Sequence, residues 1–486
     1  MKISRIFFKN DRNIVFLIVV LFLTFVARIP SLFEPFWYGD EGVYMAVAEG
    51  LSRGLDLYKG IFDNKTPGIY LLSLVAIKVL GHSIWSLRIV LSFWVLATEI
   101  ALFLLTKKLF NQKIAVVAVL VFAFLTTIPF LEGNIANGEI FMILPTVIAA
   151  LLVLNNRYFL GGSFFAFALL FKIPSLFDFL AFSIFLFLGA KYLLSNVKIL
   201  SFLFLGFLTP LFLTAFYFFL RGNFADFYFA IFSSNIGYTN YGNYFLIPNG
   251  LLIIKGVLPI ITSLYLLFKK IRGRKLTNFD LLLIWLAFAI YGSSFGGRNY
   301  AHYLIQTLPP LSIVAASLFE KKLRLASLAV LALLIGGIFM VGFRIEEIKL
   351  SYYKNFFSYL TTKNQIAYNA SFDSKVNRNY SLASFIERNT KKEDYIFLWS
   401  NDPQVYFLSA RIPPTRFTVA YHIYSYQGAK KEVVTSLVEK RPKFIFVEVP
   451  SENNFRELDN LLEKNYTFSG VIENVWIYQL ANNKGV

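Results

Sequence analysis

The stretch that decides the fold is Ile14–Ile29 (IVFLIVVLFLTFVARI), an apolar run followed closely by the polar segment Tyr38–Glu41 (YGDE). The run approaches the ~20 residues that a helix needs to cross a bilayer. Similar runs recur along the chain, which is 57% hydrophobic and has 55 Phe among its 486 residues. That share exceeds the apolar content of an ordinary soluble domain. The sequence therefore predicts a mainly α-helical, polytopic membrane protein.

Basic residues predict the orientation of the spans. Several precede the first apolar run, and the positive-inside rule places them in the cytoplasm. They are Lys2, Arg5, Lys9 and Arg12. The run lacks a small-residue cleavage site, so it predicts a retained helix and not a signal peptide. Gly68–Leu80 is only ~20 Å long as a helix, which predicts an interfacial segment and not a span.

With that segment left out, the basic loops fall on the inner side throughout. About eleven crossings result, with the amino terminus cytoplasmic and the carboxyl-terminal end outside. The predicted spans are Ile14–Ile29, Ile84–Leu105, Ile114–Leu131, Ile140–Leu154, Tyr158–Phe171, Ser175–Ala190, Ile199–Leu220, Leu251–Phe268, Phe279–Ser294, Tyr303–Phe319 and Leu325–Phe343.

The composition changes after the last predicted span, where charges become frequent and long apolar runs stop. We therefore divide the chain into a transmembrane domain, 1–343, with a first outer loop at 31–67, and an extracytoplasmic domain, 344–486. Helices and strands are expected to alternate in the tail, which predicts a small α/β domain. The expected helices are Leu382–Arg388 and Lys430–Glu439, and the expected strands are Tyr395–Trp399, Lys443–Val449 and Val475–Leu480.

Composition also bears on partners and cofactors. The net charge is +18, but the basic residues lie between apolar runs, so the charge does not indicate nucleic-acid binding. The chain has no Cys, which excludes disulfides and thiolate metal sites. His82, His302 and His422 lie far apart in sequence, so a metal site built from several histidines is not indicated. One histidine combined with carboxylates is left open.

The acidic pair Asp40-Glu41 opens a segment with apolar residues at every fourth position from Val43, typical of an interfacial helix. One interpretation makes Asp40 the helix N-cap and Glu41 a first-turn acid. The other makes Asp40 an ionised general base, which a helix start would favour. A second cluster, Asp63–Pro67 (DNKTP), lies in the same predicted outer loop and favours the functional interpretation.

Other polar residues lie at predicted outer ends of spans. Lys65 is either a snorkelling lysine or a counter-charge for a lipid phosphate. Glu139 begins a span and is either a simple first-turn acid or part of a site. Arg298 and His302 lie in the polar break GGRNYAHY, whose glycine pair and arginine could bind an anion.

The order of these parts resembles the GT-C glycosyltransferases of the protein O-mannosyltransferase family, whose bacterial relatives include lipid A aminoarabinose transferases and rhizobial lipopolysaccharide galacturonosyltransferases. The family carries an Asp-Glu pair in its first outer loop, matched here by Asp40-Glu41. It then carries an acid, a lysine and prolines before a short helix. The segment Asp63–Pro67 departs from the common Glu-Lys-Pro and Asp-His-Lys-Pro-Pro forms. This departure leaves open whether Asp63 or Asn64 replaces the family's acid.

The resemblance continues at the outer end of the fourth span, where Glu139 matches a further acid, and in the segment containing Arg298 and His302. It covers roughly residues 14 to 320. It implies a GT-C fold and transfer of a sugar, with inversion, from a polyprenyl phosphate to an extracytoplasmic acceptor in the plasma or inner membrane. The acceptor is a protein, a lipid or a cell-surface glycan, and membrane lipids are the other partners.

The resemblance also implies roles. Asp40 would take the proton of the acceptor hydroxyl, with Glu41 and Glu139 tuning the site. Lys65, Arg298 and His302 would hold the donor phosphate, and Asp63 would be a supporting acid. No cofactor is certain, and a divalent metal is left open. The chain lacks a G-x-G-x-x-G turn and a P-loop, as expected for a donor that is not a nucleotide.

Three other functions compete. A transporter or flippase usually shows broken helices near the midplane in symmetric halves, whereas the charges here gather at one predicted face. A structural or assembly protein would leave the acidic loop without a role. An oligosaccharyltransferase would use a pyrophosphate-linked glycan in place of a single sugar.

Overall fold

The computed structural model describes residues 12–189, 193–236, 252–298, 300–341, 350–451 and 453–481. The chain forms two compact units. The first contains Met1–Leu32, Arg88–Tyr217 and Ile236–Leu350, and the second contains Phe33–Leu87, Phe218–Asn235 and Ser351–Val486. The residues before Arg12 and the predicted boundary at Phe343 lie outside the described residues. The division of the chain into domains at residue 343 stays a prediction.

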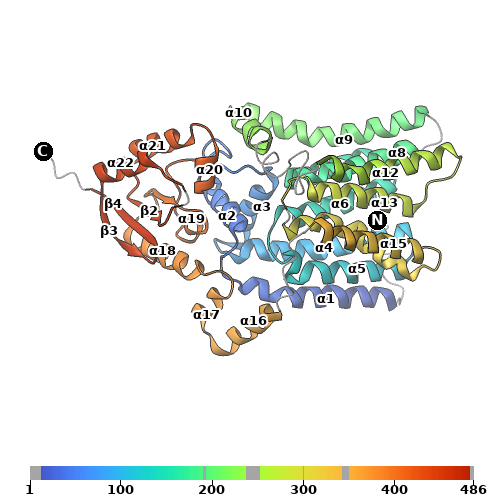
Figure 1. Ribbon diagram of the computed structural model, residues 1–486, viewed down its shortest axis with the longest axis horizontal. Helices are drawn as coiled ribbons and strands as arrows, with labels where there is room; N and C mark the ends of the chain where they lie inside the picture. Colours follow the sequence, from blue (N-terminus) through green and yellow to red (C-terminus); the bar gives the residue numbers. More distant parts are fainter. Residues whose placement is uncertain are drawn as a thin grey trace. The chain divides into compact units, whose positions relative to one another are not determined.

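The first unit is a bundle of apolar helices that run lengthwise beside one another (Figure 1). Its helices are α1 (Arg12–Phe33), α4 (Trp85–Leu109), α5 (Gln112–Thr127), α6 (Gly138–Leu154), α7 (Tyr158–Phe171), α8 (Leu176–Gly189), α9 (Leu193–Leu220), α12 (Leu252–Ile271), α13 (Asn278–Ser294), α14 (Leu308–Ala316) and α15 (Arg324–Val341), with the short 3₁₀ helices η1 (Pro129–Leu131), η2 (Ile173–Ser175), η4 (Ala301–Thr307) and η5 (Ser317–Phe319).

Length and composition support membrane crossing. Among the described residues, three helices are long and apolar enough to span a bilayer: Asn13–Phe33, Trp85–Leu109 and Asn196–Leu220. Several others are apolar but shorter, so the number of spans stays a prediction. Large apolar side chains such as Phe212 and Phe219 are exposed on α9, which suits a surface covered by lipid chains.

Two predicted spans are interrupted in the structure. The helix predicted over Ile114–Leu131 ends at Thr127 and is followed by η1, because Ile128 is extended before Pro129. Tyr303–Phe319 was expected to be a single helix, but it forms η4, α14 and η5 in succession. Pro309 and Pro310 lack backbone N–H groups and are tolerated in the first turn of a helix, so α14 begins at Leu308. Within η4, Gln306 donates to Asp178 of α8 at 2.8 Å, which fixes the 3₁₀ segment in the bundle.

Glycine allows two of the helices to pack closely. A Cβ on Gly162 of α7 would lie 2.0 Å from the carbonyl oxygen of Leu203, and a Cβ on Gly206 of α9 would lie 1.9 Å from that of Phe159. No side chain fits at either position. Small residues at helix contacts are the usual means of close approach in membrane bundles, where lipid chains are as apolar as the packing surface.

The second unit combines interfacial helices with an α/β region. Its elements are α2 (Gly39–Ser52), α3 (Gly68–Leu80), α10 (Phe224–Tyr228), the π-helix η3 (Phe229–Ser233), α16 (Leu350–Thr362), α17 (Gln365–Ala370), α18 (Val376–Asn389), β1 (Ile396–Trp399), α19 (Gln404–Leu408), α20 (Ala420–Ser425), α21 (Ala429–Lys440), β2 (Phe444–Glu448), α22 (Arg456–Asn465), β3 (Tyr466–Ile472) and β4 (Val475–Leu480).

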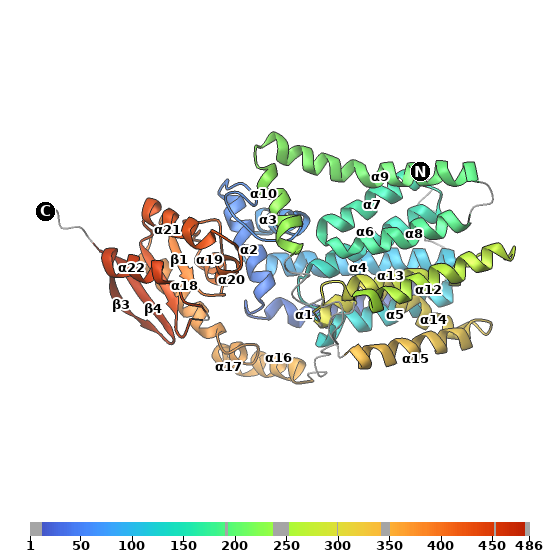
Figure 2. The ribbon, with the colours of Figure 1, turned by 45° about the horizontal axis from the view of Figure 1, so that its top comes forward.

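The four strands form one mixed sheet in the order β1-β2-β4-β3. Figure 2 shows the paired strands β3 and β4 side by side. β1 and β2 are parallel, with Ile396 opposite Phe444, and the other two pairs are antiparallel. All four residues of β1 are buried, so both faces of this strand are covered. The predicted helices and strands of the tail are present. The strand β3 and the helices α16, α17, α19, α20 and α22 are additional elements that the sequence did not indicate.

The core of the α/β region includes a residue of the first loop. Ala46 of α2 is 1% exposed and lies in one hydrophobic cluster with side chains of α18, β1 and α19. Examples of these partners are Leu382, Leu398 and Val405. The helix whose first turn carries Asp40 and Glu41 is therefore part of the core of the α/β region, although more than 300 residues separate Ala46 from these partners in the chain.

Candidate functional site

The first turn of α2 carries the acidic pair. The helix begins at Gly39 with Tyr38 as its N-cap, and no side chain of the cap accepts a hydrogen bond. The interpretation of Asp40 as the N-cap is therefore wrong by two positions, because the helix begins upstream at Gly39. Asp40 is partly exposed, whereas Glu41 is only 1% exposed. Both acids favour the positive end of the helix dipole.

Lys65 joins the two acidic segments. Its Nζ lies 3.1 Å from Oδ1 of Asp40 and 3.8 Å from Oδ2 of Asp63. The ammonium also lies 5.0 Å from the ring centre of Tyr44, a cation–π distance. The side chain of Lys65 is 18% exposed and that of Asp40 is 33% exposed, so this ion pair is open to solvent on one side.

Asp63 is buried next to the Asp40–Lys65 pair. It is 0% exposed and accepts a hydrogen bond of 2.5 Å from the hydroxyl of Tyr70 on α3. Nε2 of His422, on α20, lies 3.4 Å from the other carboxylate oxygen. We call Asp40, Asp63, Lys65 and His422 the first-loop cluster. The structure thus brings together three predicted site residues and adds a histidine from the tail.

The loop that carries Lys65 is fixed by local strain and by hydrogen bonds. Tyr58 is fully buried with φ at +71°, a left-handed conformation that is costly for a bulky residue. Its hydroxyl donates to the carbonyl of Lys65 at 2.8 Å, and the amide of Lys65 donates to the hydroxyl of Tyr70 at 3.2 Å. Backbone strain of this kind persists only where the surroundings over-determine it, as they do here.

Electrostatics set the charge states in the first-loop cluster. Burial disfavours the charged form of Lys65, but Asp40, Tyr44 and Asp63 outweigh it and raise its pKa well above the ordinary value. Burial lowers the pKa of His422 to about 4, although the Asp63 carboxylate opposes that shift. Lys65 is therefore a permanent cation and His422 is neutral near pH 7. In this pair, the partly exposed Asp40 carboxylate can accept a proton, and the Lys65 ammonium can bind an anion.

A second cluster lies in the first unit, where the predicted residues Glu139 and His302 meet. Lys172 donates to Oε1 of Glu139. Nδ1 of His302 lies 2.6 Å from Glu132, and Nε2 lies 3.9 Å from Glu139. We call Glu132, Glu139, Lys172 and His302 the span-end cluster. Both ring nitrogens of His302 face carboxylates, and its role toward a donor phosphate stays a prediction.

The backbone around Glu132 is held by an arginine of the first helix. Arg28, which is 1% exposed, donates to the carbonyls of Thr126 and Gly133 at 3.0 Å each. Glu132 lies between them with φ at +55°, again left-handed. Gly133 has no room for a side chain, because a Cβ there would lie 2.5 Å from the carbonyl oxygen of Thr126. Arg28 and Gly133 therefore aim Glu132 at His302.

The remaining predicted residue, Arg298, lies in the turn between α13 and η4 and is partly buried. For a metal, Asp63 and His422 offer two donor atoms 3.4 Å apart. No group of three or more His, Cys, Asp or Glu side chains suited to a metal ion occurs among the residues that the structure describes.

Sequence reasoning missed four participants: Tyr70, Glu132, Lys172 and His422. Lys172 had a usable signal, because a lone charge between two apolar runs requires a partner. His422 had only the weak signal of being one of three histidines in the chain. No sequence pattern linked Tyr70 or Glu132 to their partners.

The fold has a close counterpart among solved structures. ArnT from Cupriavidus metallidurans bound to undecaprenyl phosphate aligns with a TM-score of 0.61 over 97% of this chain and 98% of that chain, at 12% identity. The chain has the ArnT fold. ArnT of the same organism in the apo state aligns at 0.56, with 12% identity, over 96% of this chain and 97% of that chain. This likeness confirms the predicted GT-C fold of a multi-pass membrane protein with a small carboxyl-terminal sheet.

Other solved structures and one family model match the chain more weakly or over a shorter stretch. One is the archaeal oligosaccharyltransferase AglB from Archaeoglobus fulgidus, in complex with an inhibitory peptide and a dolichol-phosphate. It aligns with a TM-score of 0.45 and 14% identity, over 99% of this chain and 75% of that chain. Residues 376–481 match the family model "Putative competence-induced protein Ccs4 C-terminal domain", which spans α18 to β4 and not the ArnT-like bundle. No curated protein sequence matches the chain.

Proposed function

We propose that this protein is a membrane glycosyltransferase that moves a sugar from a polyprenyl-phosphate carrier to a hydroxyl of an extracytoplasmic protein, lipid or cell-surface glycan, with inversion. The observation that carries the proposal is the partly exposed Asp40 carboxylate 3.1 Å from the Lys65 ammonium. The ArnT fold supports it, because the ArnT crystal structure contains undecaprenyl phosphate.

In the proposed reaction, Asp40 accepts the proton of the acceptor hydroxyl while the acceptor oxygen bonds to the anomeric carbon. The bond between that carbon and the donor phosphate oxygen breaks, and its electron pair stays on the phosphate. Lys65 stabilises the added negative charge. Asp63 and Tyr70 hold the Lys65 loop in place from behind.

The resemblance assigns further roles within the same proposal. Glu41 and Glu139 position the acceptor or tune the site, and Arg298 and His302 add to the binding of the donor phosphate. The positive-inside pattern supports insertion in the plasma or inner membrane with the amino terminus cytoplasmic and the tail outside. Reporter fusions at Asn355 and Arg272 should therefore report opposite sides, and two reporters on the same side would overturn this orientation.

The decisive experiment is native mass spectrometry of the full-length protein purified in detergent. We expect a bound mass equal to a polyprenyl phosphate carrying one sugar. A pyrophosphate-linked glycan would replace the proposal with an oligosaccharyltransferase. Lipid movement across vesicles by the purified protein, without sugar transfer, would replace it with a flippase.

A further inference from the structure

The start of α2 lacks the usual local anchor of a helix. Its N-cap, Tyr38, makes no side-chain hydrogen bond to the first turn. Ser, Thr, Asp or Asn normally provides that bond and fixes where a helix begins. Here the position of the turn that carries Asp40 must come from tertiary contacts.

Residues of the tail supply those contacts. The side-chain amide of Gln404 donates to the carbonyl of Trp37 at 3.1 Å, and the hydroxyl of Tyr380 accepts from the amide of Phe36 at 3.1 Å. Trp37 and Phe36 directly precede the N-cap. Two hydrogen bonds from the α/β region therefore hold the backbone that leads into α2.

Gln404 also packs directly against the first turn. It is 3% exposed, and a Cβ on Gly42 would lie 2.8 Å from its Cδ. Gly42 follows Glu41 immediately, so the absence of a side chain at Gly42 lets Gln404 lie against the turn that carries the acidic pair. Gln404 thus contacts the chain before the N-cap, at Trp37, and after it, at Gly42.

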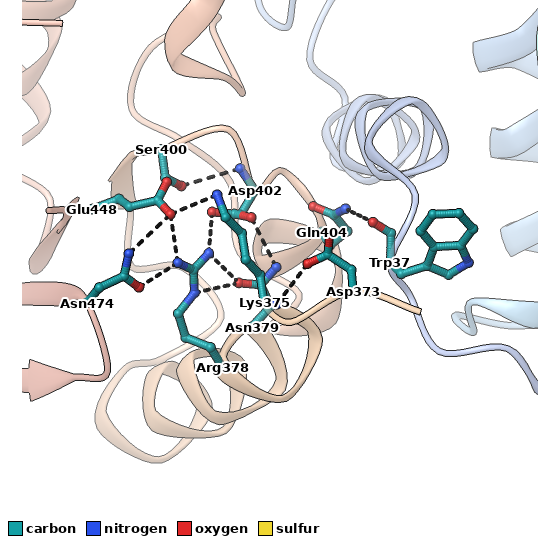
Figure 3. A network of polar contacts seen from close by, with 10 residues as sticks. All are labelled: Trp37, Asp373, Lys375, Arg378, Asn379, Ser400, Asp402, Gln404, Glu448 and Asn474. Carbon is teal, nitrogen blue, oxygen red and sulfur yellow. Dashed lines mark hydrogen bonds and ion pairs between the residues drawn. The ribbon is translucent and has the colours of Figure 1, made fainter. Parts of the chain in front are cut away.

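A buried network lies two residues before Gln404 in the chain, and Figure 3 shows it beside the hydrogen bond from Gln404 to Trp37. Arg378, which is 1% exposed, donates to Asp402 at 2.6 Å and to Glu448 and Asn474 at 2.7 Å each. It therefore ties α18 to the segment after β1, the end of β2 and the turn between β3 and β4. Asp402 lies two residues before Gln404, at the start of α19.

Burying two carboxylates with a guanidinium is not in itself efficient for stability, because desolvation offsets much of the attraction. A network of this kind can instead specify one arrangement of the segments it joins. Here the ion pair from Arg378 to Asp402 holds the backbone two residues before Gln404.

We propose that Gln404 is a positioning residue that, held by the Arg378 network, sets the place of the α2 first turn and so the Asp40–Lys65 pair. This inference rests on the proposed function, because the place of Asp40 matters for catalysis only if Asp40 is the base. Gln404 touches neither the pair nor a substrate. It acts through the backbone of Trp37 and the surface of Gly42.

The test uses the full-length protein and Gln404→Met, which keeps the length of the side chain and removes its amide. Arg378 variants are avoided, since removing one partner of a buried ion pair can unfold the domain. The matched control is Tyr466→Phe, which removes a buried hydrogen bond of 3.0 Å to the carbonyl of Pro442 in the same domain. Both variants lose one buried hydrogen bond.

The first readout is hydrogen–deuterium exchange of the peptide 36–43. We expect exchange there to rise about fivefold or more in Gln404→Met and to stay unchanged in the control, because local opening tracks the contacts that hold a segment. Equal exchange in Gln404→Met and the unsubstituted protein would overturn the inference. The same rise in Tyr466→Phe would overturn it too, since general softening would then explain both.

The second readout is the ¹³C-methyl NMR signal of Lys65 near pH 7 after methylation of the lysines, assigned as the signal absent from Lys65→Arg. Movement of Asp40 away from Lys65 should shift that signal, because the ammonium loses its nearest carboxylate. An unmoved signal in Gln404→Met would show that the cluster does not follow the helix start and would overturn the inference. Neither readout needs a donor, so failure to find a bound polyprenyl-phosphate sugar would refute the proposed function separately.

Discussion

The first-loop cluster and the span-end cluster are built from the same kinds of side chains: two carboxylates, one lysine and one histidine. In the span-end cluster, every group faces a partner at close range, and His302 lies between Glu132 and Glu139. In the first-loop cluster, Asp40 remains one-third exposed, and His422 makes no hydrogen bond with a described residue.

This difference separates two uses of the same chemistry. A closed cluster satisfies its own charges, which suits a role in holding helices together. In the first-loop cluster the Asp40–Lys65 pair is partly exposed, so a proton and a phosphate can reach it from solvent. We infer that the first loop carries the chemistry and that the span-end cluster supports it, and four experiments test that inference.

The largest effect is expected for Asp40→Asn. The amide cannot accept the acceptor proton, and positioned general bases contribute ~10²–10⁴-fold in rate. Transfer from the donor identified by mass spectrometry should fall by that factor, with little change in Tm. Asp56→Asn is the control, because it changes another partly exposed acid of the same loop, one that pairs with Arg221. An active Asp40→Asn enzyme would end the assignment of Asp40 as the base.

A pH-dependent stability is expected from His422. Its pKa is about 4 in the folded protein and 6.5 in the unfolded chain, so the unfolded chain binds more protons between those values. Stability should therefore fall as the pH drops from about 7 to 4, by up to about 3 kcal/mol. Tm measured across that range should show this fall, and His422→Phe should reduce it. A His422→Phe protein with the same pH dependence would show that His422 is not the group responsible.

Donor binding should depend on Lys65. A hydrogen bond to a charged group contributes roughly 1.5–3 kcal/mol, so Lys65→Ala should weaken binding of undecaprenyl phosphate by roughly 10–150-fold. Lys65→Arg should retain part of the affinity, because charge matters more than shape at a single phosphate contact. Lys78→Ala, an exposed lysine of α3, is the control. Unchanged affinity in Lys65→Ala would reduce Lys65 to a structural residue.

The smallest effect is expected in the span-end cluster. Glu132→Gln keeps an acceptor for His302 and loses only the charge, so Tm should fall by the equivalent of about 1 kcal/mol. Transfer should stay within about tenfold of normal. A loss as large as that of Asp40→Asn would place the chemistry in both clusters and would remove the distinction drawn between them.

The sequence predicted a large share of the fold. The bounds of α3 and α7 match the predictions residue for residue, because each lies between clear polar or proline breaks. The tail strands were predicted from β-branched and aromatic runs. The missed strand, β3, contains Gly470 and a register shift in its pairing, which weaken the strand pattern.

Within the candidate site, the charged groups could be recognised from the sequence: an acidic pair at the start of one short helix, and an acid with a lysine before the next. The local sequence is enough to recognise these groups, because ionisable residues at the ends of apolar segments cost free energy and are therefore rare there. Which of these charges meet depends on the tertiary structure. It placed His422 beside Asp63, Glu132 beside His302 and Gln404 against Gly42. The two members of each pair lie up to hundreds of residues apart in the chain. Tertiary packing brings them together, and no periodic pattern in the sequence predicts those contacts.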